Sequence, residues 1–469
     1  MGETLNKKKK FTMPFPYLIL LSIMVLVVVL TYIIPSGQYG TMVSEVTGQE
    51  VVDPTAFQYV DNANPIGFMD FFGAIHDGLV NGAGTYASLL LIAGALSVLQ
   101  VTGALDAGIH KILAISKGKE FTVVLFLLLA FSSLGAIGFG EGGLPFVPIT
   151  ISVVMALGYD RMAGAATAFF GLAIGWSSGL LNILSTGICQ NLAGLPLFSG
   201  LGLRFAGLGI FFIITVLYLY RYCRRIKKNP QLSLTADEYL TQDAAVKEGD
   251  VVEFTLSRKL LLLLLLAVLV LQAVGAVKLG WGLTQIAGLY VIFIILAVII
   301  GRINPNEACK KFTEGACSMM VVCVMIGLAN AVILLMRQGM IIDTAVHAMA
   351  QMLEGKSMIL TLFLIYLAIT IFNFFIVSGP GKAVIMMPIL SPLASLLGIN
   401  QQVITLTFCY ADGITNYLYP TSGAMLAGMM LAGLDYPKWL RFYGPLSVIL
   451  MVVAFGIILF ANAIGYGPF

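Results

Sequence analysis

Three ionisable residues, Glu141, Lys382 and Asp412, interrupt long apolar stretches of the chain. A charge near the centre of a bilayer costs about 3 kcal/mol even on insertion scales, so it is retained where it binds a substrate, an ion or a proton. We therefore interpret these residues as parts of a binding site. In the alternative interpretation, Lys382 and one carboxylate only pair with each other and fix the local geometry.

The charges lie within four interruptions, 138–143, 176–182, 378–382 and 412–422, which are rich in glycine and small polar residues. Unwound backbone at such points offers carbonyl groups to a cation and N–H groups to a carboxylate. The structural alternative is that they are kinks and close-packing glycines. The candidate substrate- and ion-binding residues are Gly140, Glu141, Gly142, Ser178, Asn182, Ser378, Gly379, Gly381, Lys382, Asp412, Asn416, Pro420, Thr421 and Ser422.

No catalytic or metal-ligating pattern accompanies these residues. The six cysteines form no CxxC pair and are interpreted as packing residues. There is no HExxH motif and no recognisable catalytic dyad, so an intramembrane enzyme is not expected. No cofactor and no metal site are expected, with Na⁺ or H⁺ left open as a coupling ion; a coupling Na⁺ would lie near Asn182 and Asn416.

Composition places these residues in a membrane protein. The chain has 469 residues, of which 59% are hydrophobic and 10% charged, whereas ordinary globular domains carry about 25% charged residues. The mean hydropathy is +0.96. A net charge of +3 gives no field that attracts nucleic acid. We therefore expect a polytopic protein whose partners are the lipid bilayer and a small-molecule substrate.

The elements that position the candidate residues are apolar helices. Stretches near 145–157 and 383–397 have the length of re-entrant half-helices rather than full spans. Stretches long enough to cross or re-enter the bilayer lie near 15–35, 85–101, 121–138, 162–181, 202–222, 259–276, 283–301, 317–336, 357–377, 402–419 and 443–463.

An internal repeat relates the two halves of the chain at an offset of about 240 residues. The string TGALDAGIHKI returns as RQGMIIDTAVHAM, which pairs Asp106 with Asp343 and His110 with His347. We interpret these four residues as helix caps and interfacial anchors. Two further matches are Asn64-Pro65 with Asn304-Pro305 and Leu203-Arg204-Phe205 with Leu440-Arg441-Phe442.

The distribution of Lys and Arg orients the two copies. No Lys or Arg occurs between Lys10 and Lys111, which predicts that Asn64-Pro65 lies outside the membrane. Arg302, Lys310 and Lys311 flank Asn304-Pro305 and predict that this segment lies inside, so the copies are inverted.

The same distribution gives the domain organisation. The N-terminus is expected inside and the C-terminus outside. The predicted order is a cytoplasmic N-terminus (1–13), a first membrane repeat (14–222) with an extracytoplasmic loop (36–64), a cytoplasmic linker (223–259), an extra span (260–282) and a second, inverted repeat (283–469).

The predicted fold class is therefore an all-α polytopic membrane protein made of two inverted repeats with re-entrant helical hairpins and broken helices. Inverted halves with sites at the bilayer midplane are typical of secondary transporters. A channel is the remaining alternative, because channels also use broken helices, but no pore-lining filter is recognisable.

The second-half interruptions also carry a family resemblance. The run SGPGKAVIMMPILSPLASLLGINQQVITLTFCYADGITNYLYPTSGAMLAGMMLAGLDYPKWLRF resembles the YfcC-like branch of the anaerobic four-carbon-dicarboxylate carrier family, which includes arginine/ornithine exchangers. The segments FPYLILLSIMVLVVVLTYIIPSGQYG, NPIGFMDFF and GEGGLPFVPI are similar to it too. The resemblance implies the ion-transporter superfamily, a scaffold that forms a homodimer, and a transport domain that moves as an elevator.

The chain departs from the family pattern at three points. Lys382 stands where the family usually has a neutral, Gln-like residue, and Pro380 stands where it has Ser. The first change leaves two roles open for Lys382: to replace a coupling cation or to bind a substrate carboxylate. Asn182-Ile183-Leu184 replaces Asn-Pro-Phe, which leaves a regular helix at Asn182 as an alternative to a break.

The resulting functional prediction is a secondary active transporter of the inner (plasma) membrane that exchanges amino acids. The resemblance favours basic or related amino acids. A Na⁺- or H⁺-coupled carrier of C4-dicarboxylates or other small organic acids is the close alternative. Glu141 and Asp412 suit a cationic group of the substrate, and Lys382 suits a carboxylate.

Overall fold

The computed structural model describes residues 16–43, 50–60, 66–115, 118–236, 253–279, 281–353 and 355–467. The predicted N-terminal segment 1–13, the pair Asn64-Pro65 and residues 237–252 of the predicted linker lie outside the described residues.

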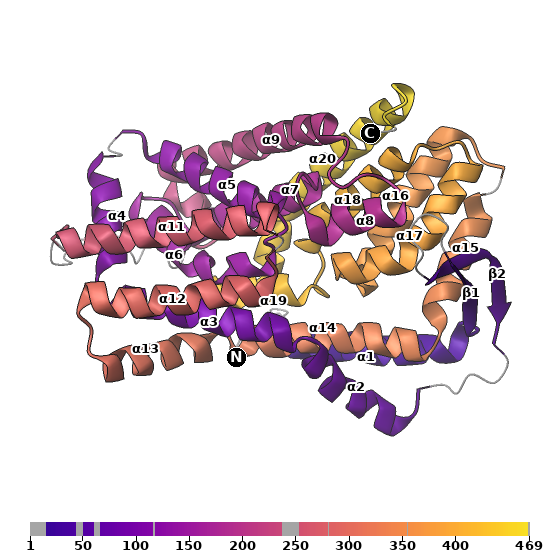
Figure 1. The fold of residues 1–469 in the computed structure, drawn as a ribbon. Helices are drawn as coiled ribbons and strands as arrows, with labels where there is room; N and C mark the ends of the chain where they lie inside the picture. Colours follow the sequence, from indigo (N-terminus) through magenta and orange to yellow (C-terminus); the bar gives the residue numbers. More distant parts are fainter. Residues whose placement is uncertain are drawn as a thin grey trace, which may run out of the picture.

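The first half begins with a helix and a β-hairpin and continues as helices (Figure 1). Its elements are α1 (Pro16–Ile33), β1 (Gly37–Val43), β2 (Glu50–Tyr59), α2 (Phe68–Asn81), α3 (Ala83–Val101), α4 (Ala104–Ile115), α5 (Glu120–Ala136), the 3₁₀ helix η1 (Glu141–Phe146), α6 (Val147–Ala156), α7 (Arg161–Ser178), the π-helix η2 (Ile183–Gly187), α8 (Ile188–Leu192), α9 (Leu201–Lys228) and the 3₁₀ helix η3 (Pro230–Leu232).

The described elements of the second half are all helices. Its elements are α11 (Leu256–Lys278), α12 (Leu283–Gly301), α13 (Pro305–Ser318), α14 (Met320–Gln338), α15 (Ile341–Leu353), α16 (Met358–Phe375), α17 (Gly379–Leu396), α18 (Gln401–Asn416), α19 (Gly423–Leu431) and α20 (Tyr436–Ala463).

The element order after α3 resembles that after α14. In each case a short amphipathic helix (α4, α15) is followed by a helical hairpin (α5–α6, α16–α17), a helix interrupted in its middle (α7–α8, α18–α19) and a 28-residue helix (α9, α20). Figure 1 shows α4 at one end of the molecule and α15 at the other.

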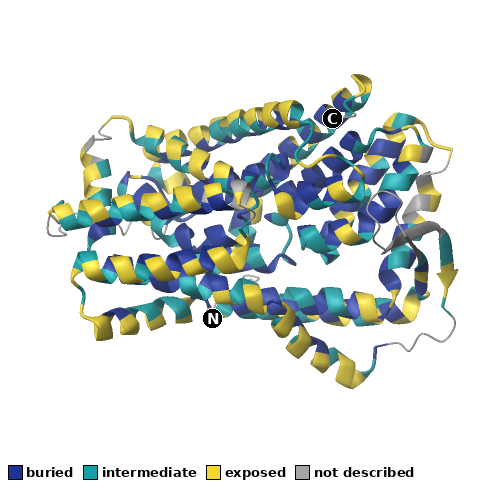
Figure 2. Ribbon diagram, in the orientation of Figure 1, coloured by how far each residue is buried: buried dark blue, intermediate teal, exposed yellow. Residues whose placement is uncertain are grey.

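Seven helical segments of the described chain are long and apolar enough to cross a membrane. The outward faces of α9, α11 and α12 are exposed in Figure 2 and carry large apolar side chains such as Ile213, Leu263 and Ile299. Such faces fit contact with lipid. The seven segments are Ala83–Val101, Arg161–Leu192, Leu201–Lys228, Leu283–Gly301, Pro305–Gln338, Met358–Phe375 and Tyr436–Ala463.

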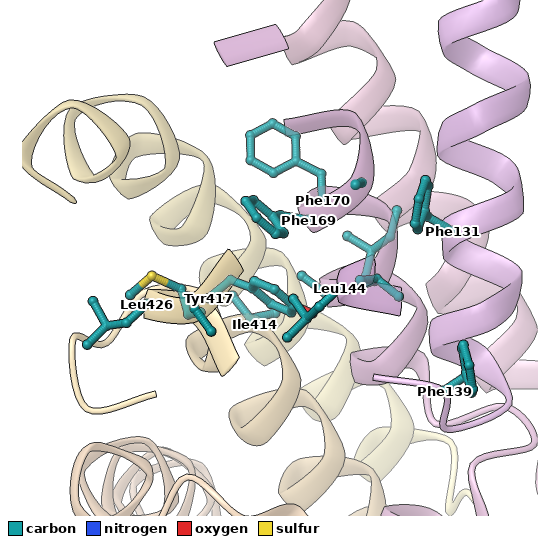
Figure 3. Close-up of a cluster of buried hydrophobic side chains, with 14 of the residues drawn as sticks. Phe131, Phe139, Leu144, Phe169, Phe170, Ile414, Tyr417 and Leu426 are labelled. Atoms are coloured by element: carbon teal, nitrogen blue, oxygen red, sulfur yellow. The ribbon is translucent and has the colours of Figure 1, made fainter. Parts of the chain in front are cut away.

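The two halves exchange contacts at their hairpins. The tip helix η1 of the first half contacts α19 of the second, and α17 of the second half contacts α8 and η2 of the first. Figure 3 shows the apolar cluster at the first of these contacts, which includes Leu144 of η1, Leu426 of α19 and Tyr417. The Phe169 ring of α7 lies 5.6 Å from that of Tyr417, centroid to centroid. Each half therefore packs its hairpin against the interrupted helix of the other.

A β-hairpin in the predicted extracytoplasmic loop departs from the all-α expectation. Strands β1 and β2 pair antiparallel, with Gly37 opposite Tyr59. An isolated two-stranded hairpin is only marginally stable in water. Here the Tyr39 N–H donates to Asp343 Oδ2 at 3.2 Å, and the Phe57 ring stacks on His347 at 3.8 Å. The strands therefore depend on packing against α15, which local sequence patterns do not reveal.

The helices that flank the predicted linker are longer than the apolar pattern indicates. Helix α9 extends to Lys228 and α11 begins at Leu256, so both enter the polar segment 223–259. The last turn of α9 contains Arg225, Lys227 and Lys228, and cations are stabilised at a helix C-terminus. Charged residues therefore continue this helix beyond its apolar part.

Candidate functional site

The first interrupted helix ends at a glycine. Gly179 follows α7 in the left-handed conformation, with φ 56°, and Asn182 adopts an extended conformation before η2. Glycine ends a helix in this way without steric cost, so no proline is needed. A regular helix at Asn182, which the sequence left open, is therefore wrong. The Asn182 Oδ1 atom accepts the N–H groups of Leu184 and Ser185 at 3.0 and 3.2 Å and caps the second segment.

The second interrupted helix has a similar break. Helix α18 ends at Asn416, and Ser422 caps α19 by accepting the N–H of Met425 at 3.2 Å. Residues 417–422 connect the two segments, with Pro420 half-buried and Thr421 buried. Both breaks thus leave a helix C-terminus and a helix N-terminus inside the protein, where their dipoles can act on charges.

The two interrupted helices cross with their backbones in contact. A Cβ atom built on Gly413 of α18 would lie 2.5 Å from the backbone N of Ser177 on α7. Only glycine allows this approach. On one side of the crossing, Gly179 at the first break lies against Cys409 of α18; on the other side, Tyr417 at the second break lies against Phe169 of α7.

Trp176 on α7 lies between the two hairpin tips. A Cβ atom on Gly140, at the first tip, would lie 3.0 Å from Cζ3 of the Trp176 ring. A Cβ atom on Gly379, at the second tip, would lie 3.1 Å from Cζ2 of the same ring and 3.1 Å from Oδ2 of Asp412. The tips therefore approach the same indole from different edges.

A cavity of about 400 Å³ lies between these tips and the helices α3 and α14. Its wall includes Trp176, and Asn81, Asn330 and Tyr417 add polar groups. Glu141 is exposed to this space and is the only charged residue among the described residues that line it. The predicted residues that line the cavity are Gly140, Glu141, Gly142, Ser378, Gly379, Asn416, Thr421 and Ser422.

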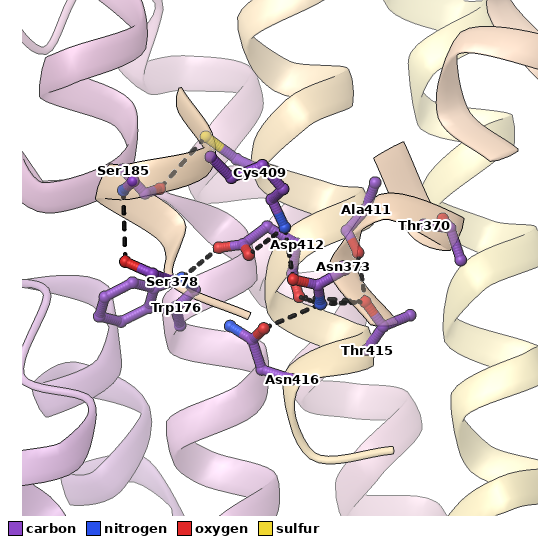
Figure 4. Close-up of polar contacts among 12 residues, drawn as sticks. Trp176, Ser185, Thr370, Asn373, Ser378, Cys409, Ala411, Asp412, Thr415 and Asn416 are labelled. Atoms are coloured by element: carbon purple, nitrogen blue, oxygen red, sulfur yellow. Dashed lines mark hydrogen bonds and ion pairs between the residues drawn. The ribbon is translucent and has the colours of Figure 1, made fainter. Parts of the chain in front are cut away.

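Lys382 and Asp412 do not line the cavity and form a fully buried ion pair. Figure 4 shows Asp412 with Asn373 and Trp176. The Lys382 Nζ atom lies 2.7 Å from Asp412 Oδ1 and also donates to Asn373 Oδ1. The second carboxylate oxygen, Oδ2, accepts the Trp176 Nε1–H at 2.7 Å. Removal of one partner of such a pair costs about 3–5 kcal/mol, because the other charge stays buried. Asp412, rather than Glu141, is therefore the partner of Lys382.

Asn373 on α16 connects this pair to the end of α18. Its Nδ2 group donates to the backbone O of Asp412 at 3.1 Å, to Thr415 Oγ1 at 2.6 Å and to Asn416 Oδ1 at 2.9 Å. The side-chain oxygens of Asn416 and Asn182 thus both accept protein N–H groups. Either residue would therefore need backbone carbonyls to hold Na⁺. The predicted Na⁺ ion is one of two alternatives, the other being that Lys382 supplies the positive charge.

The remaining predicted residues make hydrogen bonds that stabilise the local fold. Ser178 Oγ donates to the Gly175 O atom at 2.6 Å, and the Gly381 N–H donates to Ser378 Oγ at 3.3 Å. Asn182 is fully buried, and its Nδ2 group has no hydrogen-bond partner among the described residues. The candidate residues therefore divide between the wall of the cavity and a buried polar layer behind it. Binding by any of these residues stays a prediction.

Sequence reasoning did not select three residues that shape this region. Trp176 joins the cavity to the ion pair, and Asn373 joins the ion pair to α18. Arg204 of α9 is fully buried and donates to the Gly179 O atom at 3.2 Å, at the end of α7. Asn373 was visible as a lone amide in an apolar helix, and Arg204 as part of a repeated Leu-Arg-Phe string.

The repeated Asp and His pairs lie away from this site. Asp106 and His110 on α4 are exposed, as interfacial anchors would be. Asp343 and His347 on α15 hold the β-hairpin, and His347 Nδ1 lies 3.1 Å from the Tyr39 hydroxyl. Burial raises the pKa of Asp343 above its usual range. One of its carboxylate oxygens accepts the N–H of Tyr39 in β1, so Asp343 anchors the hairpin to α15.

Comparisons with known proteins point to transport. The model of a family described as C4-dicarboxylate anaerobic carrier (DcuC) matches residues 13–463. The chain is 29% identical to an Escherichia coli (strain K12) protein named "Putative basic amino acid antiporter YfcC", over 98% of each chain. It is 28% identical to an uncharacterized Haemophilus influenzae protein, over 96% of each chain.

Two solved transporter structures are also similar. The Alcanivorax borkumensis YdaH transporter has a TM-score of 0.46 and 16% identity, over 97% of this chain and 99% of that one. Neisseria gonorrhoeae MtrF, described among antimetabolite efflux pumps, has a TM-score of 0.46 and 17% identity, over 96% and 95% of the chains.

Proposed function

Because the chain belongs to the C4-dicarboxylate anaerobic carrier (DcuC) family, and is therefore a multi-pass transporter of the cell membrane, we propose that it exchanges basic amino acids. The observation that carries this proposal is Glu141, the only charged residue among the described residues of the cavity wall. An acidic side chain in an otherwise neutral cavity attracts a cationic substrate group. The cavity volume of about 400 Å³ lies in the range of small-molecule sites.

The carboxylate of an amino acid also has a place in this cavity. The N-terminal ends of α17 and α19 reach its wall at Gly379 and Gly423. Helix N-termini present N–H groups and a partial positive charge, which favour an anion. An amino acid with a cationic side chain could therefore satisfy Glu141 and the helix ends at the same time.

A C4-dicarboxylate carrier is the competing proposal, because the family description names that substrate class. The two helix N-termini would suit one carboxylate. The second carboxylate would share the cavity with Glu141, and like charges at short distance repel. Lys382 does not compensate for this repulsion, since Asp412 and Asn373 already hold its ammonium group.

Counterflow in proteoliposomes separates the two proposals. Vesicles loaded with arginine, ornithine or succinate are supplied with the labelled compound, and we expect counterflow with the basic amino acids. Glu141→Gln should weaken their apparent affinity by about tenfold or more, equivalent to 1.4 kcal/mol. The control Glu307→Gln changes an exposed carboxylate on α13 and should have no effect. Counterflow of succinate alone, retained or improved in Glu141→Gln, would favour the dicarboxylate carrier.

We further propose that the halves form inverted repeats and that the protein works as a homodimer by an elevator movement. The recurring element order supports the repeat, and the position of the cavity between the tips and α3 and α14 supports the movement. In this scheme α14 stays in place while α19, which contacts it, moves with the substrate. If this movement is needed, a disulfide that joins α14 to α19 should stop exchange. The homodimer is tested by measuring the mass of the purified protein in detergent.

A further inference from the structure

The ammonium group of Lys382 lies where two helices end. It is held by Asp412, near the C-terminal end of α18, and by Asn373, in the last turn of α16. Helix C-termini carry a partial negative charge, which stabilises a cation. Lys382 itself belongs to the first turn of α17, so its side chain extends from one helix start to two helix ends.

The surroundings of this ammonium have the chemistry of a site for a small monovalent cation. Its two ligands are a carboxylate oxygen and an amide oxygen, both in fully buried residues. The Phe408 ring, with its centroid 5.5 Å from Nζ, adds a cation–π contact. Hard oxygen donors of this kind are also the ligands of hydrated metal cations such as Na⁺. One positive charge here balances the one negative charge of Asp412.

Only the Trp176 side chain separates the Lys382–Asp412 pair from the cavity. Trp176 lines the cavity and donates its Nε1–H to the carboxylate oxygen of Asp412 that faces away from Lys382. Two other charged groups lie near the breaks. Glu141 is in the cavity wall, and Arg204 donates to Gly179 O and to Gln402 Oε1, at 3.4 Å for the latter. In the described residues, neither forms an ion pair with Lys382 or Asp412.

We infer that Lys382 is a tethered cation that takes the place of a mobile coupling cation, so that exchange proceeds without Na⁺. This inference rests on the proposed exchange function, because it concerns the coupling of that same transport step. A tethered charge neutralises Asp412 in every state of the protein, whatever the ion concentrations on the two sides. The substrate gradients alone then drive transport, as in an exchanger.

Removal of the tethered charge should create a site for a free cation. In Lys382→Gln, the oxygens of Asp412 and Asn373 remain while the negative charge loses its partner. We expect the melting temperature of this purified variant to rise by roughly 5 °C between 1 and 100 mM NaCl, with choline chloride holding the ionic strength constant. Saturable binding of ²²Na⁺ should accompany the shift, and the wild type should show neither effect.

Two further variants isolate the cause. Lys382→Gln/Asp412→Asn removes both charges, so Na⁺ should no longer stabilise the protein. Lys356→Gln changes an exposed lysine outside the site and should behave as the wild type. If H⁺ is the free cation that replaces the ammonium, Lys382→Gln will be stabilised by lowering the pH instead of by Na⁺. That result also supports the inference.

Several outcomes would overturn it. One is a folded Lys382→Gln variant that neither Na⁺ nor acid stabilises, and another is Na⁺ binding by the wild type. If Lys382→Gln does not fold, exchange by the wild type still tests the inference. This exchange should be unchanged when choline replaces Na⁺, and a requirement for Na⁺ refutes the inference. The melting and ²²Na⁺ measurements use no substrate, so an error in the proposed substrate class would leave them unaffected.

Discussion

At the residue scale, Trp176 connects the cavity with the buried ion pair. Its indole ring lines the cavity, and its Nε1–H donates to Asp412 Oδ2 at 2.7 Å. A hydrogen bond to a buried charge contributes more than one between neutral groups. Substrate contact with the ring can therefore affect the geometry of the charges behind it.

This arrangement gives a prediction for Trp176→Phe. The variant keeps an aromatic ring in the cavity wall but leaves Asp412 Oδ2 without its donor, which should lower the unfolding free energy by about 1–3 kcal/mol. Thermal unfolding and substrate binding by calorimetry measure the effect, and both should weaken. Trp281→Phe, between α11 and α12, is the control. Equal losses in the two variants would show that the hydrogen bond has no special role.

At the element scale, the two interrupted helices depend on a close crossing. Gly413 allows the backbone of α18 to contact that of α7 at Ser177, and both helices end within three residues of this contact. The hairpins then pack against the partner half, η1 on α19 and α17 on α8. The cavity walls therefore come from elements of both halves.

We predict that Gly413→Ala separates these helices. The added Cβ would clash with backbone atoms, which cannot move aside as a flexible side chain can, so we expect a loss of about 1–3 kcal/mol in stability together with impaired exchange. The matched control is Gly456→Ala on α20, where a Cβ meets no atom within 4 Å. The melting temperatures of the two variants test the idea, and a loss in Gly456→Ala as large as that in Gly413→Ala would contradict it.

At the scale of the whole molecule, the distribution of basic residues predicts the orientation in the membrane. The β-hairpin is expected outside, and the segment after α9, with its Arg and Lys residues, is expected in the cytoplasm. The exposed residues Gln58 and Gln231 mark these two places.

Cysteine accessibility tests this orientation in intact cells. In a background that lacks the exposed Cys309 and Cys317, a membrane-impermeant maleimide should label Gln58→Cys directly. It should label Gln231→Cys only after the membrane is permeabilised. Labelling of Gln231→Cys in intact cells, with Gln58→Cys protected, would show that the orientation is opposite to the predicted one. Labelling of both from one side would rule out the predicted odd number of crossings between them.

The sequence by itself determined that this is a polytopic, mainly helical membrane protein, because apolar length and scarce charge leave few other solutions in a bilayer. It also selected Glu141, Lys382 and Asp412, since charges inside apolar sequence are costly and therefore informative. It did not reveal the β-hairpin, whose strands depend on contacts with α15.

The tertiary structure decided how the selected residues are divided. It paired Lys382 with Asp412 behind the wall and left Glu141 in the cavity. It also brought Asn373 and Trp176 into the polar layer. These partners come from four helices, and Trp176 lies 236 residues before Asp412, so their distances depend on helix crossings and close packing. Local pattern and composition contain no such information, because the same residues would give the same pattern whichever helices they met.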